Sequence, residues 1–200
     1  MPSGTDHHEL ITRREAILRV SALLGGVALV GQGAMLSGCV RRMPGGTGFT
    51  EADVALLDEI AETILPETST PGAKAAGTGQ FIALMVNDTY DAREQQVFRD
   101  GLQTLDDECR KMHGASFMPA TSAQRLALLE SLDAEQMQYM HGRSDDAPAH
   151  YFRMLKELTL LGYFTSEIGY NQAMRYVESP GRFDPCTPYA PGEKSWASHV

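Results

Sequence analysis

Apolar residues recur three and four positions apart through most of residues 50–178, and no segment shows sustained alternation of apolar and polar residues. The first stretch is representative, because it places on one face Val54, Leu57, Ile60, Ala61 and Ile64. This spacing is the period of an amphipathic helix, whereas a half-buried strand needs a period of two. The sequence therefore predicts an all-α fold, a single compact domain of five to seven helices.

Capping and breaking residues place the first helix and the loop that follows it. Thr50 can cap the helix, with Asp53 as the matching residue of a capping box. Pro66 ends the helix, and a long loop of turn residues is expected over 67–79.

The next two helices are expected over 80–90 and 91–114. In the first of them, Phe81, Leu84, Met85 and Asp88 are expected to face inward or toward a partner. The second is amphipathic and ends at Gly114. Its apolar stripe consists of Val97, Phe98, Leu102, Leu105 and Cys109.

The second half of the domain continues with helical patterns. Thr121 and Gln124 form a capping box at the start of a helix ending near 132, and a separate short helix is expected over 133–140. Pro148 is placed to enter the most apolar helix, 151–177, which is expected to be central and to break near 162–166. From Ser179 onward the Pro-rich chain is expected to form an extended C-terminal arm.

Two adjacent arginines precede a moderately apolar run near the N-terminus. Arg13 and Arg14 lie in "TRREAIL", and the apolar run behind them is diluted by glycines, which disfavour a helix interior. Basic residues, a moderately apolar region and small residues at its end are typical of a signal peptide. The arginine pair is the bacterial address for export of folded proteins. We therefore interpret residues 1–38 as a twin-arginine signal peptide rather than a membrane span or a chance pair.

The apolar run closes with "LSGC", whose last residue is Cys39. This resembles the lipobox of bacterial lipoproteins, in which the cysteine becomes a lipidated N-terminus. The acyl chains would anchor the protein to a membrane, since each buried CH₂ contributes about 0.8 kcal/mol. The sequence thus divides into the signal with lipobox (1–38), a Gly-rich tether (39–48) and a helical domain (49–200), with a periplasmic location. A chance cysteine after a signal cleaved elsewhere is the alternative.

Charge and cysteine content narrow the partners. The formal net charge is −9 at pH 7, and an acidic chain without a basic patch argues against nucleic acid. Besides Cys39, the chain contains Cys109 and Cys186. In an oxidising compartment these two could form a disulfide that joins the middle of the domain to its arm, or remain separate thiols.

A search for catalytic or cofactor motifs finds none. The sequence lacks a phosphate-binding loop, a c-type haem motif and a helical metal-binding histidine pair. Ser166 and Glu167 have no histidine at catalytic spacing. The residues alone therefore point to an exported helical accessory protein without a visible catalytic, cofactor or metal site.

Three separated motifs resemble the gluconate 2-dehydrogenase subunit 3 family. They are "ILPETSTPGAKAAG" (64–77), "LTLLGYFTSEIG" (158–169) and "Y-x-x-x-PGRFDPC" (176–186), in family order. The resemblance extends from about Phe49 to the C-terminus. It implies a small subunit that binds a large FAD-dependent dehydrogenase of the glucose–methanol–choline type, with a c-type cytochrome often accepting the electrons. The small subunit would supply the twin-arginine signal for both chains and stabilise the large one, whose sugar or sugar-acid substrate stays open.

The partner interface is expected on the two long loops and on the break after residue 162. Such loops contribute little to a core, and long ordered loops are often functional, although plain surface connections are the alternative. The expected contact residues are Pro71, Gly72, Gly77, Tyr163, Phe164, Ser166, Gly169, Pro180 and Gly181. A free-standing periplasmic lipoprotein or binding protein without a dehydrogenase partner is the alternative function.

Overall fold

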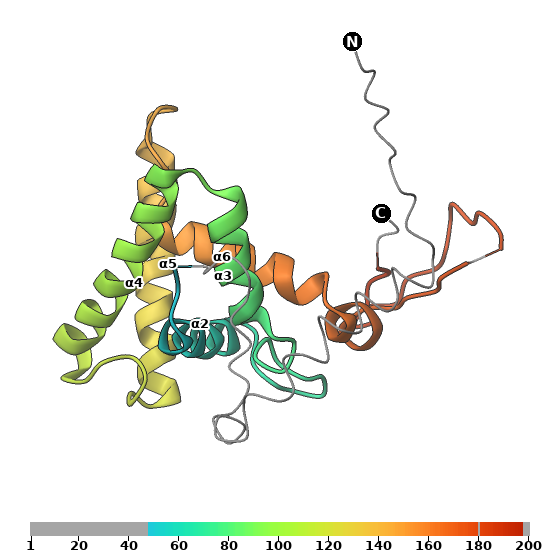
Figure 1. The fold of residues 1–200 in the computed structure, drawn as a ribbon. Coiled ribbons are helices and arrows are strands. Elements are labelled where there is room, and N and C mark those ends of the chain that lie inside the picture. The colour runs from blue at the N-terminus through green and yellow to red at the C-terminus, as the bar shows by residue number, and fades with distance from the viewer. Residues whose placement is uncertain (1–47, 180, 198–200) are drawn as a thin grey trace, which may run out of the picture. The chain divides into compact units, whose positions relative to one another are not determined.

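The computed structural model describes residues 48–179 and 181–197, and this part of the chain is all-α, as predicted (Figure 1). Arg13, Arg14, Cys39 and Pro180 lie outside the described residues. The helices are α2 (Glu51–Ile64), α3 (Thr78–Thr89), α4 (Ala92–His113), α5 (Ser122–Gly142), α6 (Tyr151–Phe164) and the π-helical turn η1 (Gly169–Ala173). Among the described residues, no helix combines the length and the hydropathy that crossing a membrane requires.

Capping boxes begin three of these helices. The predicted capping boxes at Thr50 and Thr121 are both present, with Asp53 and Gln124 as the reciprocal partners. Asp91 begins α4 in the same way, because its carboxylate accepts hydrogen bonds from two backbone N–H groups of the first turn. Each cap satisfies donors that the first turn of a helix would otherwise leave without a partner.

Two expected boundaries were wrong. The helices predicted over 120–132 and 133–140 are one continuous helix, α5. Asp133 does not break it, because its carboxylate accepts hydrogen bonds from Gln136 on the next turn (3.0 Å) and from Lys156 of α6 (2.7 Å). Pro148 does not enter α6 directly, since that helix begins at Tyr151 with His150 as its cap.

α6 is the central helix, in contact with every other helix of the described chain. Glycines allow two of these close approaches. Gly101 of α4 lies against the ring of Tyr151, and a Cβ at Gly162 would lie 2.6 Å from the ring of Phe81 on α3. After Phe164 the helix breaks as predicted, and the chain turns at Thr165 and Ser166 before η1.

The core contains one large apolar cluster contributed by α2 to α6. Its fully buried members include Leu57, Ile60, Phe98, Leu105 and Leu155. The α3 positions that were expected to face inward or toward a partner are not the most buried ones. Ile82, Ala83 and Val86 are buried, whereas Leu84 is exposed and Phe81 and Met85 are half-buried. α3 packs against both α2 and α6, and an apolar helix with two packed sides does not reveal its inner face from spacing alone.

We expect Leu105→Ala to lower the free energy of unfolding by about 2–5 kcal/mol, because it would leave a cavity in the main cluster. Leu126→Ala is the matched control. Leu126 is 48% exposed on α5, so its truncation should change stability by no more than about 0.5 kcal/mol. Urea unfolding followed by circular dichroism measures both, and equal effects would contradict the packing described above.

Candidate functional site

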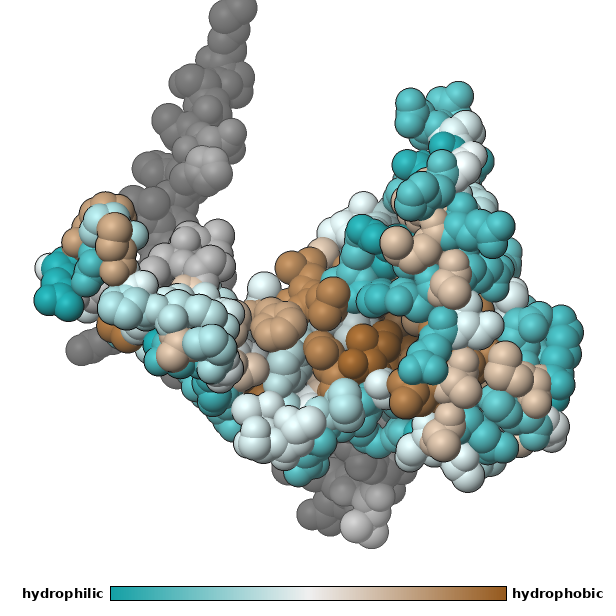
Figure 2. Space-filling model, turned by 180° about the vertical axis from the view of Figure 1, so that it is seen from behind, coloured by the Kyte–Doolittle hydropathy of each residue, from teal (hydrophilic) through white to brown (hydrophobic). Residues whose placement is uncertain are grey.

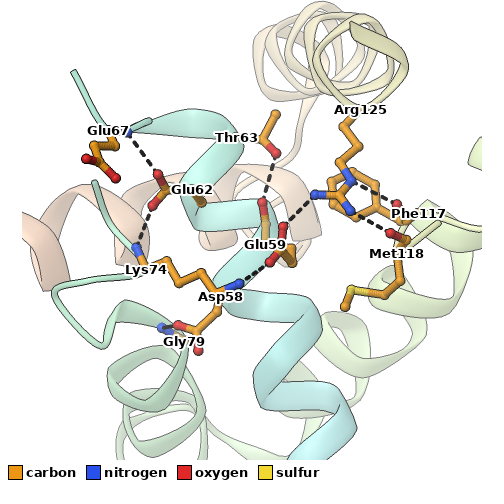
Figure 3. A network of polar contacts seen from close by, with 10 residues as sticks. All are labelled: Asp58, Glu59, Glu62, Thr63, Glu67, Lys74, Gly79, Phe117, Met118 and Arg125. Atoms are coloured by element: carbon orange, nitrogen blue, oxygen red, sulfur yellow. Dashed lines mark hydrogen bonds and ion pairs between the residues drawn. The ribbon is translucent and has the colours of Figure 1, made fainter. Parts of the chain in front are cut away.

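Two carboxylates of α2 hold down the long loop between α2 and α3 (Figure 3). Glu62 accepts hydrogen bonds from the backbone N–H of Glu67 (2.8 Å) and of Lys74 (2.9 Å). Asp58 accepts one from the backbone N–H of Gly79, in the first turn of α3 directly after the loop, at 2.8 Å. The loop has no regular secondary structure to supply partners for its backbone N–H groups. These side-chain acceptors therefore satisfy the N–H groups and keep the loop ordered against the domain.

A third carboxylate of α2, Glu59, joins this loop to the α4–α5 connection. It forms ion pairs with the ammonium group of Lys74 and, at 2.5 Å, with the guanidinium of Arg125 on α5. Arg125 also donates hydrogen bonds to the carbonyls of Phe117 (3.0 Å) and Met118 (2.5 Å). Figure 3 shows this chain of contacts running from the loop, across α2, to α5.

The two neighbouring carboxylates respond in opposite directions to these surroundings. Hydrogen bonding from Lys74 and then from Arg125 lowers the pKa of Glu59, although partial burial opposes the shift. Burial raises the pKa of Asp58 despite the hydrogen bond from Gly79 and the charge of Lys74. The favourable charged network is therefore centred on Glu59.

The loop also contacts the end of α6, so the structure brings together two segments that were predicted to form the partner interface. The hydroxyl of Tyr163 donates a hydrogen bond to the carbonyl of Pro71, at 2.8 Å. Tyr163, Ala61 and Ala73 form a second, small buried cluster. Partly buried residues pack around it, namely Leu65, Ala76, Ile168 and Ala173.

Several predicted contact residues face the inside of the domain. Gly72, Tyr163 and Gly169 are buried. A Cβ at Gly72 would meet the Glu62 carboxylate, and one at Gly169 would meet the Tyr163 carbonyl, so both glycines permit close packing. Ser166 accepts a hydrogen bond from the Gly169 N–H (3.0 Å) and donates one to the Tyr163 carbonyl (2.7 Å).

The other predicted contact residues are accessible. Gly77 and Gly181 are exposed, and both have a positive φ of 69°, which favours glycine. Phe164 is also exposed, and Pro71 is half-buried. These residues can contact a partner directly, whereas the buried ones support the surface from within.

An exposed apolar surface on α6 includes Phe164, which was predicted as a contact residue, together with Leu160 and Leu161, which were not. Leu160, Leu161 and Phe164 are all at least 36% exposed, and Phe164 lies one turn after the two leucines. Leu84, on the neighbouring helix α3, is exposed to a similar extent. Figure 2 shows brown, hydrophobic side chains gathered in the middle of this view of the molecule. The sequence signal was present, since the C-terminal half of α6 is apolar on every side, which is unusual for a solvent-covered helix.

The two described cysteines are separate thiols. Cys109 is buried in α4, where burial raises the pKa of its thiol, and Cys186 is exposed in the arm. The disulfide considered from the sequence is therefore not formed in the structure, because one sulfur lies in the core and the other on the surface.

The described residues contain no group of three or more His, Cys, Asp or Glu side chains that could hold a metal ion. The hollow beside Arg99, about 350 Å³ in volume, is lined by charges of both signs and by apolar side chains. Ser166 is engaged with backbone groups of its own turn.

Comparison with known families decides the class of protein. The sequence model of gluconate 2-dehydrogenase subunit 3 matches residues 51–181, from the start of α2 to the beginning of the arm. The chain belongs to this family. Neither the curated proteins nor the solved structures compared gave a match. As a member of the family, the chain is an accessory subunit of a multi-subunit dehydrogenase.

We expect Glu62→Ala to release the loop of this dehydrogenase subunit, because two backbone N–H groups lose their acceptor. The free energy that holds the loop against the domain should fall by about 1–3 kcal/mol. Hydrogen exchange at Glu67 and Lys74 should become faster, while exchange in α4 stays unchanged. Glu130→Ala, at an exposed position of α5, is the control. Unchanged exchange in the loop would contradict the assigned role of Glu62.

We also expect an acid-dependent loss of stability centred on Glu59. A lowered pKa in the folded state stabilises the fold above the ordinary glutamate pKa, and this contribution is lost as the pH falls through the folded value. Glu59→Gln should therefore destabilise the protein at neutral pH, and the difference from wild type should shrink below about pH 4. Urea unfolding from pH 7 to pH 3 measures this. A difference that stays constant with pH would exclude the charged network as its source.

Proposed function

We propose that this chain is the non-catalytic small subunit of a membrane-associated, FAD-dependent dehydrogenase that oxidises a sugar or sugar acid. The observation that carries the proposal is the family match over residues 51–181. In this proposal, FAD and the catalytic residues belong to a large subunit of the glucose–methanol–choline type. A c-type cytochrome subunit with haem c would take the electrons onward.

The small subunit would bind and stabilise the large one. The structure supports this role through its ordered, accessible surfaces. The loop around Pro71 is fixed by α2 and by Tyr163, and the exposed side chains of Leu160, Leu161 and Phe164 lie on the same helix as Tyr163. Exposed apolar side chains on a rigid helix are suited to a protein interface, where their burial is favourable.

The small subunit would also supply export for the complex. The proposal rests on the sequence, in which Arg13 and Arg14 precede the apolar run and Cys39 ends it. A twin-arginine substrate crosses the membrane already folded, so a cofactor-loaded large subunit can be exported together with this chain. Acylation of Cys39 would then hold the complex at the membrane, on the periplasmic side.

The test is to replace Arg13 and Arg14 together by lysine and to fractionate the cells. We expect both this chain and the flavin-dependent, sugar-oxidising activity of its partner to remain in the cytoplasm, because the arginine pair is read by the export receptor. Arg19→Lys is the matched control within the same segment and should leave export unchanged. Mass spectrometry of the wild-type mature N-terminus should find an acylated Cys39.

Other outcomes would separate the parts of the proposal. Normal export of the double variant would remove the twin-arginine role, and an unmodified N-terminus elsewhere would remove the lipid anchor. Immunoprecipitation of the full-length wild-type chain should recover a yellow flavoprotein. Recovery of the chain alone would favour the free-standing lipoprotein instead.

A further inference from the structure

The C-terminal arm is closed at its base by residues far apart in the sequence. The backbone of Arg175 donates to the carbonyl of Ser195 and accepts from the N–H of Ala197, both at 2.8 Å. The Arg175 guanidinium lies over the ring of Trp196, 4.5 Å from its centroid. These contacts, the clasp, fix the two ends of the arm beside η1 (Figure 1, orange to red).

Charged side chains reinforce the clasp. Arg175 also forms an ion pair with Glu193 at 3.3 Å, and the ammonium group of Lys194 donates to the carbonyl of Gln172. Ala197, directly after Trp196, is buried. The arm is therefore a loop with both ends anchored, which reduces the conformational freedom of the residues between them.

The part of the arm beyond the clasp is exposed throughout the described residues. It presents two large aromatic side chains, Phe183 and Tyr189, which are 89% and 66% exposed. Near the clasp, the N–H of Glu193 donates to the carbonyl of Ala190, with Gly192 at a φ of 88° after Pro191. This is the pattern of a type II turn, in which proline and glycine preset the backbone.

Residues 182–190 of the exposed arm are neutral although the chain as a whole is acidic. Between residues 182 and 190 the charged side chains are Arg182 and Asp184, which lie 3.7 Å apart. The segment also begins where the family match ends, at residue 181. Its recognition chemistry is therefore aromatic and apolar rather than ionic.

We propose that residues 182–190 dock into an apolar groove of the catalytic subunit, with Phe183 and Tyr189 as the anchoring side chains. This inference rests on the proposed function and names the surface that performs it. Two buried aromatic side chains supply about 150–250 Å² each, and a stable interface needs roughly 800 Å² from each partner. The exposed face of α6 provides further apolar area. Arg175 and Trp196 are positioning residues, because an arm held in its bound form loses less entropy on docking.

The first test measures the affinity of full-length variants for the flavoprotein subunit. This subunit is obtained by dissociating the complex that is recovered with the wild-type chain. Phe183→Ser with Tyr189→Ser should weaken binding at least tenfold, since truncation of central aromatic residues is typically that costly. Met137→Ser is the matched control, because Met137 is 49% exposed on α5 and should leave the affinity unchanged. Circular dichroism and thermal unfolding should be the same for all three proteins.

The second test examines the clasp and uses Cys186 as a reporter within the arm. Trp196→Ala should weaken binding while both anchors remain, and Trp196→Phe should restore it, because a phenyl ring also accepts the guanidinium. In peptide-resolved maleimide labelling, Cys186 should react rapidly in the free chain and slowly in the complex. Cys109 should stay unreactive in both, since it is buried.

Unchanged affinity of the double serine variant, with Cys186 equally reactive in free chain and complex, would overturn this inference and leave the proposed function intact. Protection of Cys186 in the purified chain alone, rising with concentration, would assign the arm to a second copy and would also overturn it. Failure of the wild-type chain to bind any flavoprotein would overturn the proposed function and this inference together.

Discussion

The contacts of α2 carboxylates with backbone N–H groups are the interactions on which the surface of this subunit depends. The loop between α2 and α3 contains threonine, serine, proline and glycine, so it has little apolar area with which to hold itself against the domain. Glu62 accepts two hydrogen bonds from its backbone, Asp58 accepts one from the first turn of α3, and Glu59 forms an ion pair with Lys74. Because Glu59 also pairs with Arg125, the position of the loop is coupled to α5 and to the α4–α5 connection.

The same loop depends on the end of α6 through Tyr163. Its hydroxyl bonds to Pro71 and its ring packs with Ala61 and Ala73, so a polar and an apolar contact act at one place. Two of the segments that resemble the family most, 64–77 and 158–169, are thus neighbours in the fold. Two of their glycines are explained by internal packing, since Gly72 faces Glu62 and Gly169 faces the Tyr163 carbonyl. A motif can therefore mark an interface without all its residues touching a partner.

Local signals in the sequence were sufficient wherever the interactions were local. The caps at Thr50 and Thr121 and the end of α4 at Gly114 depend on residues a few positions apart, and all three are present as predicted. Spacing was not sufficient for α3, which packs on two sides, or for Asp133, whose acceptor role involves Lys156 of another helix. Spacing also did not distinguish the accessible contact residues from the buried ones. Phe164, Gly77 and Gly181 are exposed, whereas Tyr163, Gly72 and Gly169 are buried.

The sequence by itself determined the helical class, the main helix boundaries and the family, because helical period, caps and motifs are written in neighbouring residues. Only the tertiary structure decided which residues of those motifs are accessible. It also showed that Arg175 and Trp196 close the arm across some twenty intervening positions, and that Cys109 and Cys186 occupy different environments. Such pairings depend on where distant segments meet, and burial depends on what every neighbouring element covers. Neither therefore leaves a local pattern in the sequence from which it could be predicted.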